Sequence, residues 1–187
     1  MDFDGDGDND LVVVCPDKPH NGTYFFENTE GNVKMPVFKP GVRISAGADN
    51  VQVCYVGGKA RVMGPAREYV DFARRGLGLS KKFPLSPKLG HRGKIRADQW
   101  KYADFDGDGD LDLLCGEFLD KFTYFENIGS RRKPKYKAGQ RLAFNGRPIA
   151  MNLQMIVPVA IDWDRDGVPE LLVGAEDGFL YHQRRDR

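Results

Sequence analysis

The sequence predicts an all-β chain made of repeated units of about four short antiparallel strands, with one insertion that contains a short helix. Three observations support this fold class. An acidic loop followed by an apolar strand occurs three times, the 187 residues include 22 glycines and 11 prolines, and there are 12 Phe and 7 Tyr beside many Val. Glycine and proline favour turns, whereas aromatic and β-branched residues favour strands.

Each repeated unit begins with an acidic loop that leads directly into an apolar strand. The three segments are DFDGDGDNDLVVV from Asp2, DFDGDGDLDLLCG from Asp104 and DWDRDGVPELLVG from Asp162. A polar turn and an aromatic second strand follow each of them, TYFFEN at 23–28, FTYFEN at 122–127 and GFLYHQ at 178–183. Self-similarity of this kind predicts a repeat architecture.

The first two units continue in parallel, because segments 35–44 and 133–142 both read as a proline-marked third strand. A further strand, such as 155–161, leads into the next acidic loop. We therefore divide a single domain, 1–187, into units at about 1–45, 91–145 and 146–187.

The first two acidic loops lie farther apart than the last two, and residues 46–90 hold the surplus. This segment is either an insertion or a degenerate unit without an acidic loop. The flanking strands align directly, which favours the insertion. Within it, residues 65–78 open with proline and close on glycine, a pattern that predicts a short helix.

Numbered from its first aspartate, each loop carries carboxylates at positions 1, 3, 5 and 9, and a glycine at position 6 that permits a sharp turn. Ca²⁺ prefers six to eight oxygen ligands, and so dense a cluster of carboxylates requires a cation to offset its self-repulsion. We expect position 7 to contribute its backbone carbonyl. The predicted ligands of up to three calcium ions are Asp2, Asp4, Asp6, Asp8 and Asp10; Asp104, Asp106, Asp108, Asp110 and Asp112; and Asp162, Asp164, Asp166, Val168 and Glu170.

The third loop departs from the other two, since Arg165 replaces a glycine and Glu170 replaces the last aspartate. We expect its site to be the weakest or to have a different shape. The alternative, that these Asp-Gly strings are only solvated turns, is disfavoured by three copies that precede the same apolar strand. An EF-hand is excluded, because position 12 holds Val13, Cys115 and Val173 instead of a bidentate glutamate.

The acidic loops, the DLLVG-like strands and the YFEN strands resemble the FG-GAP/VCBS repeats of integrin-α-type, calcium-binding β-propellers. The resemblance implies β-propeller blades of four antiparallel strands, with calcium loops between the first two strands of a blade. It also implies an extracellular or cell-surface location, although no signal peptide follows Met1. With three to four blades, the chain is expected to be an incomplete propeller. The missing blades would come from the same longer chain or from a homo-oligomer.

The resemblance implies no single activity. The leading hypothesis is a calcium-stabilised module that binds a glycan or protein partner, with calcium in a structural role. The alternative is part of a propeller-type polysaccharide lyase or another carbohydrate-active enzyme acting on acidic glycans. A lyase needs a cation to neutralise the uronate and a base to remove a proton. Its catalytic candidates are His91, Arg96 and Tyr102, near Arg92, Lys94 and Lys101. If HRGKIR is a strand, His91 faces away from its basic neighbours, and the balance therefore leans away from an enzyme.

The net charge of +1 argues against nucleic acid, and the basic segment 131–137 accompanies no nucleic-acid-binding motif. Assigning twelve of the 27 acidic residues to the loops leaves fifteen against 28 Lys and Arg. This surplus favours an acidic glycan as partner. No apolar run approaches the length of a membrane span.

Two further residue types have structural interpretations. Cys15 and Cys115 lie in apolar strand-like runs, and three cysteines cannot all pair internally, so small buried apolar residues are favoured over disulfides or reactive thiols. Trp100, four residues before the second loop, is expected to pack between strands. Trp163 is expected to be an aromatic residue within its loop, like Phe3 and Phe105.

Overall fold

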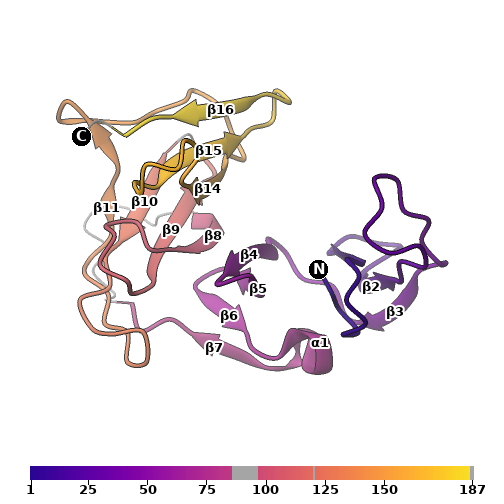
Figure 1. Cartoon of the computed structure of the whole chain (residues 1–187). Coiled ribbons are helices and arrows are strands. Elements are labelled where there is room, and N and C mark those ends of the chain that lie inside the picture. The colour runs from indigo at the N-terminus through magenta and orange to yellow at the C-terminus, as the bar shows by residue number, and fades with distance from the viewer. Residues whose placement is uncertain (86–96, 120, 186–187) are drawn as a thin grey trace.

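The computed structural model describes residues 1–85, 97–119 and 121–185, which form four successive antiparallel sheets and one small hairpin (Figure 1). The first sheet contains β1 (Leu11–Cys15), β2 (Gly22–Phe26) and β3 (Val42–Ser45), and the second contains β4 (Gln52–Val56), β5 (Lys59–Gly64), β6 (Arg67–Tyr69) and β7 (Ser80–Lys82). The third contains β8 (Ala97–Ala103), β9 (Asp112–Glu117), β10 (Phe122–Phe125) and β11 (Gln140–Arg141). The fourth contains β14 (Val157–Ile161), β15 (Glu170–Gly174) and β16 (Leu180–Gln183), and the hairpin joins β12 (Ala143–Phe144) to β13 (Arg147–Pro148).

The prediction of an all-β chain built from small antiparallel sheets is confirmed. The third sheet has the predicted four strands, with the second acidic loop between β8 and β9. The first and fourth sheets have three strands each, and no closed propeller is seen in the described part of the chain. Among these residues, no helix has the length and apolarity that crossing a membrane requires.

The strand after each acidic loop pairs with the aromatic strand in the same register. Val12 lies opposite Phe25 in the first sheet, Leu114 opposite Tyr124 in the third, and Leu172 opposite His182 in the fourth. Because all three pairs involve position 11 of the loop numbering, Phe25, Tyr124 and His182 occupy equivalent places. The acidic loops described below contact the second strand of each sheet at these three places.

Segment 46–90 contains the second sheet, whose strands follow one another in the order β4-β5-β6-β7. The predicted helix is present but short: α1 (Phe72–Arg75) and the 3₁₀ turn η1 (Gly76–Gly78) lie between β6 and β7. Residues 67–69, expected in the helix, form a strand because they pair with both β5 and β7. The segment thus contains four strands. This is the number expected of a degenerate unit without an acidic loop, which was the alternative to an insertion.

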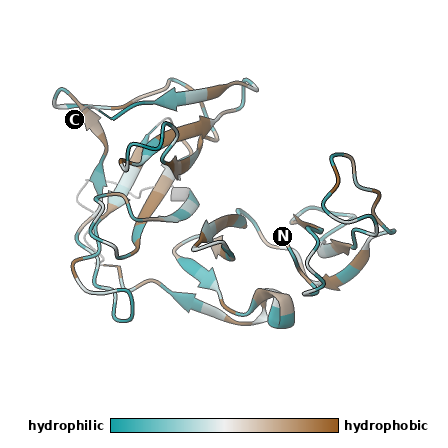
Figure 2. Ribbon diagram, in the orientation of Figure 1, coloured by the Kyte–Doolittle hydropathy of each residue, from teal (hydrophilic) through white to brown (hydrophobic). Residues whose placement is uncertain are grey.

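Apolar clusters fill the spaces between successive sheets. The cluster between the first two sheets centres on Val62, Tyr69 and Phe72; the next on Met63, Trp100, Leu113, Cys115, Phe125 and Tyr136; and the last on Ala103, Phe105, Leu114, Phe122, Ile156, Leu171 and Val173. Alternate residues of a strand face opposite sides of its sheet, so β9 contributes residues to two clusters. It is buried along its whole length. Figure 2 shows the apolar residues concentrated in such strands.

Trp100 packs as expected, with its ring stacked on Phe125 at 5.4 Å between centroids. All three cysteines are free: Cys115 is buried, whereas Cys15 and Cys54 are half-buried. Only Cys115 is thus the fully buried apolar residue that its sequence context suggests.

The third and fourth sheets approach each other closely at Gly116. A Cβ atom there would lie 2.2 Å from the Ile156 carbonyl oxygen and 2.7 Å from Pro158 Cδ. Gly116→Ala is expected to lower the free energy of unfolding by about 1–3 kcal/mol, because the overlap forces the backbone to shift. Gly78→Ala is the control, since its Cβ would meet nothing within 4 Å. Equal effects of the two changes in urea unfolding would contradict this close approach.

Candidate metal centres

The three acidic loops share one set of local hydrogen bonds, in which aspartate side chains accept from backbone N–H groups two residues later. The N–H at position 5 donates to the carboxylate at position 3, over 3.2 Å for Asp6 and Asp4, 3.2 Å for Asp108 and Asp106, and 3.3 Å for Asp166 and Asp164. The N–H at position 7 donates to the carboxylate at position 5, over 2.9 Å for Asp8 and Asp6, 2.9 Å for Asp110 and Asp108, and 2.8 Å for Val168 and Asp166. Each loop therefore curls around its own side chains.

Positive φ angles at positions 4 and 6 make this curl possible. Position 4 is Gly5, Gly107 or Arg165, with φ of 87°, 80° and 63°, and position 6 is glycine throughout. Arg165 thus adopts the left-handed backbone that glycine adopts in the other loops, at a conformational cost of about 1–2 kcal/mol. The third loop shares with the second the bond from the N–H at position 6 to the first aspartate, but it adds a bond from Asp166 N to Asp162 Oδ1 at 2.9 Å. Its weaker affinity stays a prediction.

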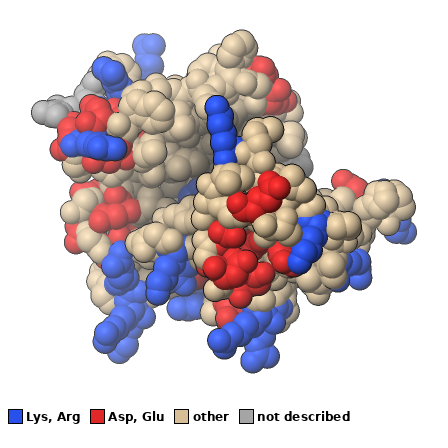
Figure 3. All heavy atoms as spheres, turned by 45° about the vertical axis from the view of Figure 1, so that its right-hand side comes forward, with Lys and Arg blue, Asp and Glu red and all other residues tan. Residues whose placement is uncertain are grey.

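Each loop brings three aspartates together, each with an oxygen within 4.8 Å of the others. In the second and third loops these are positions 1, 3 and 5, namely Asp104, Asp106 and Asp108, and Asp162, Asp164 and Asp166. In the first loop they are positions 1, 3 and 9, namely Asp2, Asp4 and Asp10, and Asp2 accepts from Gly5 N at 2.8 Å. Figure 3 shows acidic side chains gathered in compact patches on the face in view.

The acid at position 9 joins the loop to the strands behind it. Asp112 is fully buried, and its Oδ2 accepts from Phe105 N at 3.0 Å and from the Tyr124 hydroxyl at 2.9 Å. Its Oδ1 accepts from Asn127 N at 2.8 Å, beyond the end of β10. Asp112 therefore holds the start of its own loop and the aromatic strand together.

The other two loops repeat this connection with different partners. Asp10 accepts from Phe3 N at 2.9 Å and from Asn28 N at 3.0 Å. The longer Glu170 instead places Oε2 2.8 Å from His182 Nε2, and His182 stands where Tyr124 stands in the third sheet. The pair Glu170–His182 thus replaces the pair Asp112–Tyr124.

The aromatic residue at position 2 contacts this same place in the second strand. Ring centroids are 4.8 Å apart for Phe3 and Phe25, 5.4 Å for Phe105 and Tyr124, and 5.7 Å for Trp163 and His182. Each loop is therefore fixed at its beginning by a ring contact and at its end by a buried acid. The sequence interpretation assigned the acid to the metal and missed this second role, although the asparagine of the repeated EN dipeptide marks its partner.

The charges of the loops favour a bound cation. Burial raises the pKa of Asp110, and the charges of Asp108 and Asp112 raise it further. Burial also raises the pKa of Asp112, against the N–H groups of Asn127 and Phe105. Asp104 Oδ1 is buried and finds no hydrogen-bond partner among the described residues, a state that costs about 1–3 kcal/mol. A hard cation would supply the missing interaction, so this donor set fits calcium.

Of the catalytic candidates, Tyr102 lies in β8 and donates its hydroxyl to Glu68 Oε2 at 3.0 Å. Burial and the neighbouring Glu68 carboxylate raise the pKa of Tyr102, which keeps its phenol protonated at neutral pH. His91 and Arg96, together with Arg92 and Lys94, lie outside the described residues. Lys101 is buried, and its ammonium donates to the Val53 carbonyl at 2.8 Å, which joins β8 to β4.

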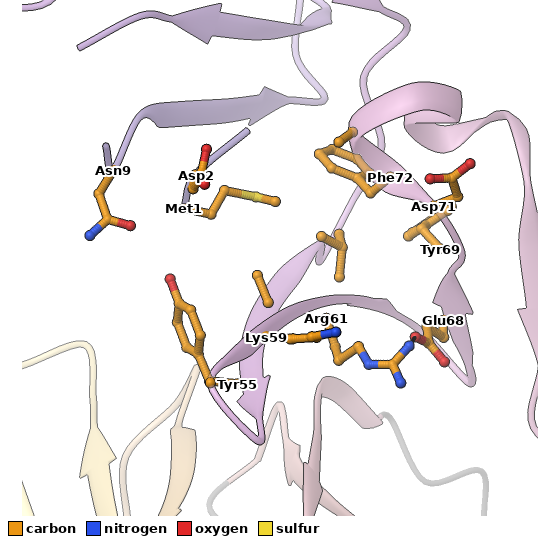
Figure 4. A pocket seen from close by; sticks show the side chains of 14 residues that line it. Met1, Asp2, Asn9, Tyr55, Lys59, Arg61, Glu68, Tyr69, Asp71 and Phe72 are labelled. Carbon is orange, nitrogen blue, oxygen red and sulfur yellow. Dashed lines mark hydrogen bonds and ion pairs between the residues drawn. The ribbon is translucent and has the colours of Figure 1, made fainter. Parts of the chain in front are cut away.

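A cavity of about 640 Å³ lies between the first loop and the second sheet (Figure 4). Asp2 lines it from the loop, and Tyr55, Lys59 and Asp71 line it from the second sheet and the start of α1. Acidic and basic side chains both line this cavity, so its charges favour neither an anionic nor a cationic ligand.

An FG-GAP-like repeat spans residues 104–173, the part of the chain that matches the model of this family. The match begins at the second acidic loop and ends within β15, so it includes both triads formed by positions 1, 3 and 5. No curated protein and no solved structure matches the chain significantly.

Proposed function

We propose, from the FG-GAP-like repeat at residues 104–173, that the chain is a calcium-stabilised repeat module of an extracellular or cell-surface protein that binds a glycan or protein partner. The observation that carries this proposal is a cluster of three aspartates in each of the three loops ahead of β1, β9 and β15, with positions 1 and 3 in every cluster. Three such clusters in equivalent places are not expected of unrelated solvated turns.

Calcium has a structural role in this proposal. A bound ion would neutralise the clustered carboxylates, and each loop already fastens two strands of its sheet through a buried acid and a ring contact. A loop that calcium orders would therefore also stabilise the strands that form the core. We propose further that additional blades, from a longer chain or a second copy, complete the assembly, since two of the four sheets have only three strands.

Calorimetric titration of EDTA-stripped protein with CaCl₂ tests the metal sites. We expect three ions per chain, and two for the double variant Asp106→Asn/Asp108→Asn, which removes two charges from one triad. Asp17→Asn/Asp49→Asn removes the same charge from exposed aspartates outside the loops and should leave three. The absence of saturable calcium binding, or an unchanged stoichiometry in the loop variant, would contradict the proposal.

A further inference from the structure

A second cavity, of about 440 Å³, lies between the second and third sheets, within the size range of small-molecule sites. Its wall includes Lys81 of β7 and Arg61 of β5 from the second sheet. The third sheet contributes Tyr102 of β8 and, from the turn after β10, Arg131. Leu111 also lines it, so the cavity borders the end of the second acidic loop.

The ionisable side chains of this cavity carry a surplus of positive charge. Arg61, Lys81 and Arg131 face one carboxylate, that of the buried Glu68. Arg61 Nη1 donates to Glu68 Oε1 at 2.8 Å, so this pair is internally neutral; Figure 4 shows the same pair from the neighbouring cavity. Neither Lys81 nor Arg131 forms an ion pair with another residue in the described ranges. Two cations are therefore left to meet a ligand.

Neutral hydroxyl groups stand beside these cations. The Tyr102 hydroxyl donates to Glu68 Oε2 at 3.0 Å, which holds it in place while leaving its lone pairs open to a donor. The hydroxyl of Tyr136, whose side chain is largely buried, has no hydrogen-bond partner within the parts of the chain that are described. Val56, Val70 and Pro134 add apolar surface.

We propose that this cavity binds a carboxylate-bearing sugar of an acidic glycan, with Lys81 and Arg131 holding the carboxylate. The tyrosine hydroxyls meet the sugar hydroxyls, and the apolar residues meet the face of the ring. A carboxylate alone would need only the cations, whereas this combination fits a polar ring that carries one. The inference names the partner class of the proposed module and rests on that function, because calcium in the second loop would order the wall at Leu111.

Calorimetry of the full chain in CaCl₂ and 150 mM NaCl, with a hyaluronan tetrasaccharide as probe, tests this inference. We expect saturable binding that is lost when the carboxyl groups of the tetrasaccharide are reduced to alcohols. Lys81→Ala/Arg131→Ala should weaken binding about fivefold, since both side chains are exposed and each exposed ion pair contributes about 0.5 kcal/mol. Lys82→Ala/Arg132→Ala is the control, because it removes the same charge from neighbours that are equally exposed but lie outside the cavity, and it should change binding less than about twofold.

Four other outcomes overturn the inference, each in a distinct way. Equal losses in the two double variants would show general attraction to a polyanion, and equal binding of the reduced sugar would remove the role of the carboxylate. Equal binding of tetraglutamate would assign the cavity to an acidic peptide. No binding of the tetrasaccharide by protein that calcium stabilises would reject the inference and leave the metal sites standing. Calcium-independent stability with intact sugar binding would instead support the sugar site and reject the structural role of calcium.

Discussion

Removing calcium with excess EDTA is expected to lower the melting temperature by about 10 °C or more. A ligand that binds only the folded state at a hundredfold excess over its dissociation constant adds about 2.7 kcal/mol per site. For a chain of 187 residues, each kcal/mol corresponds to about 2–4 °C, so two occupied sites already give such a shift. The physical reason is that calcium offsets the repulsion between carboxylates within each triad. It also gives the unpaired Asp104 Oδ1 a partner.

Circular dichroism melts in saturating CaCl₂ and in EDTA measure this shift. Re-addition of calcium should restore the higher melting temperature, whereas Mg²⁺, which demands a small octahedral site and keeps its waters, should restore less. Asp106→Asn/Asp108→Asn should show a smaller calcium-dependent shift than the unaltered protein. Identical melts with and without calcium would remove the structural role of the ion.

Asp112→Ala is expected to lower the free energy of unfolding by about 3 kcal/mol or more, even in EDTA. The change deprives the backbone N–H groups of Phe105 and Asn127 and the Tyr124 hydroxyl of their acceptor, and each buried orphan costs about 1–3 kcal/mol. The effect therefore does not depend on bound metal.

Asp110→Ala is the matched control, two residues away in the same loop. Asp110 Oδ1 is buried without a hydrogen-bond partner among the described residues, and burial raises its pKa, so removal of this carboxylate should leave apo stability within about 0.5 kcal/mol or increase it. Both variants are compared by urea unfolding in EDTA. A loss for Asp112→Ala that occurs only in the presence of calcium would mean that this carboxylate acts as a metal ligand and not as the link between strands.

The hairpins and the aspartate triads were predicted correctly from local patterns in the sequence. Three acidic loops, each followed by an apolar strand and an aromatic strand, predict the β1–β2, β9–β10 and β15–β16 hairpins, because turn residues and strand formers lie close together in the chain. The same spacing brings positions 1, 3 and 5 together in the second and third loops, as the triads show.

The structure differs from the sequence prediction where segments that are distant in the chain contact each other. An aspartate at position 9 is equally suited to a metal and to backbone N–H groups, and only the paired strand supplies Asn127 and Tyr124 to Asp112. Residues 67–69 look helical with their neighbours but become a strand because β5 and β7 flank them. The basic cavity combines Lys81 with Arg131, whose proximity depends on the packing of two sheets.

The positions of bound calcium test the central claim most directly. Crystals grown with CaCl₂ and measured for anomalous scattering should give a peak within each triad: between Asp2 and Asp4, between Asp104 and Asp108, and between Asp162 and Asp166. The third peak should have the lowest occupancy at limiting calcium. Well-ordered loops without an anomalous peak at any triad would show that these aspartates form turns held by their own hydrogen bonds, and the account of a calcium-stabilised module would be wrong.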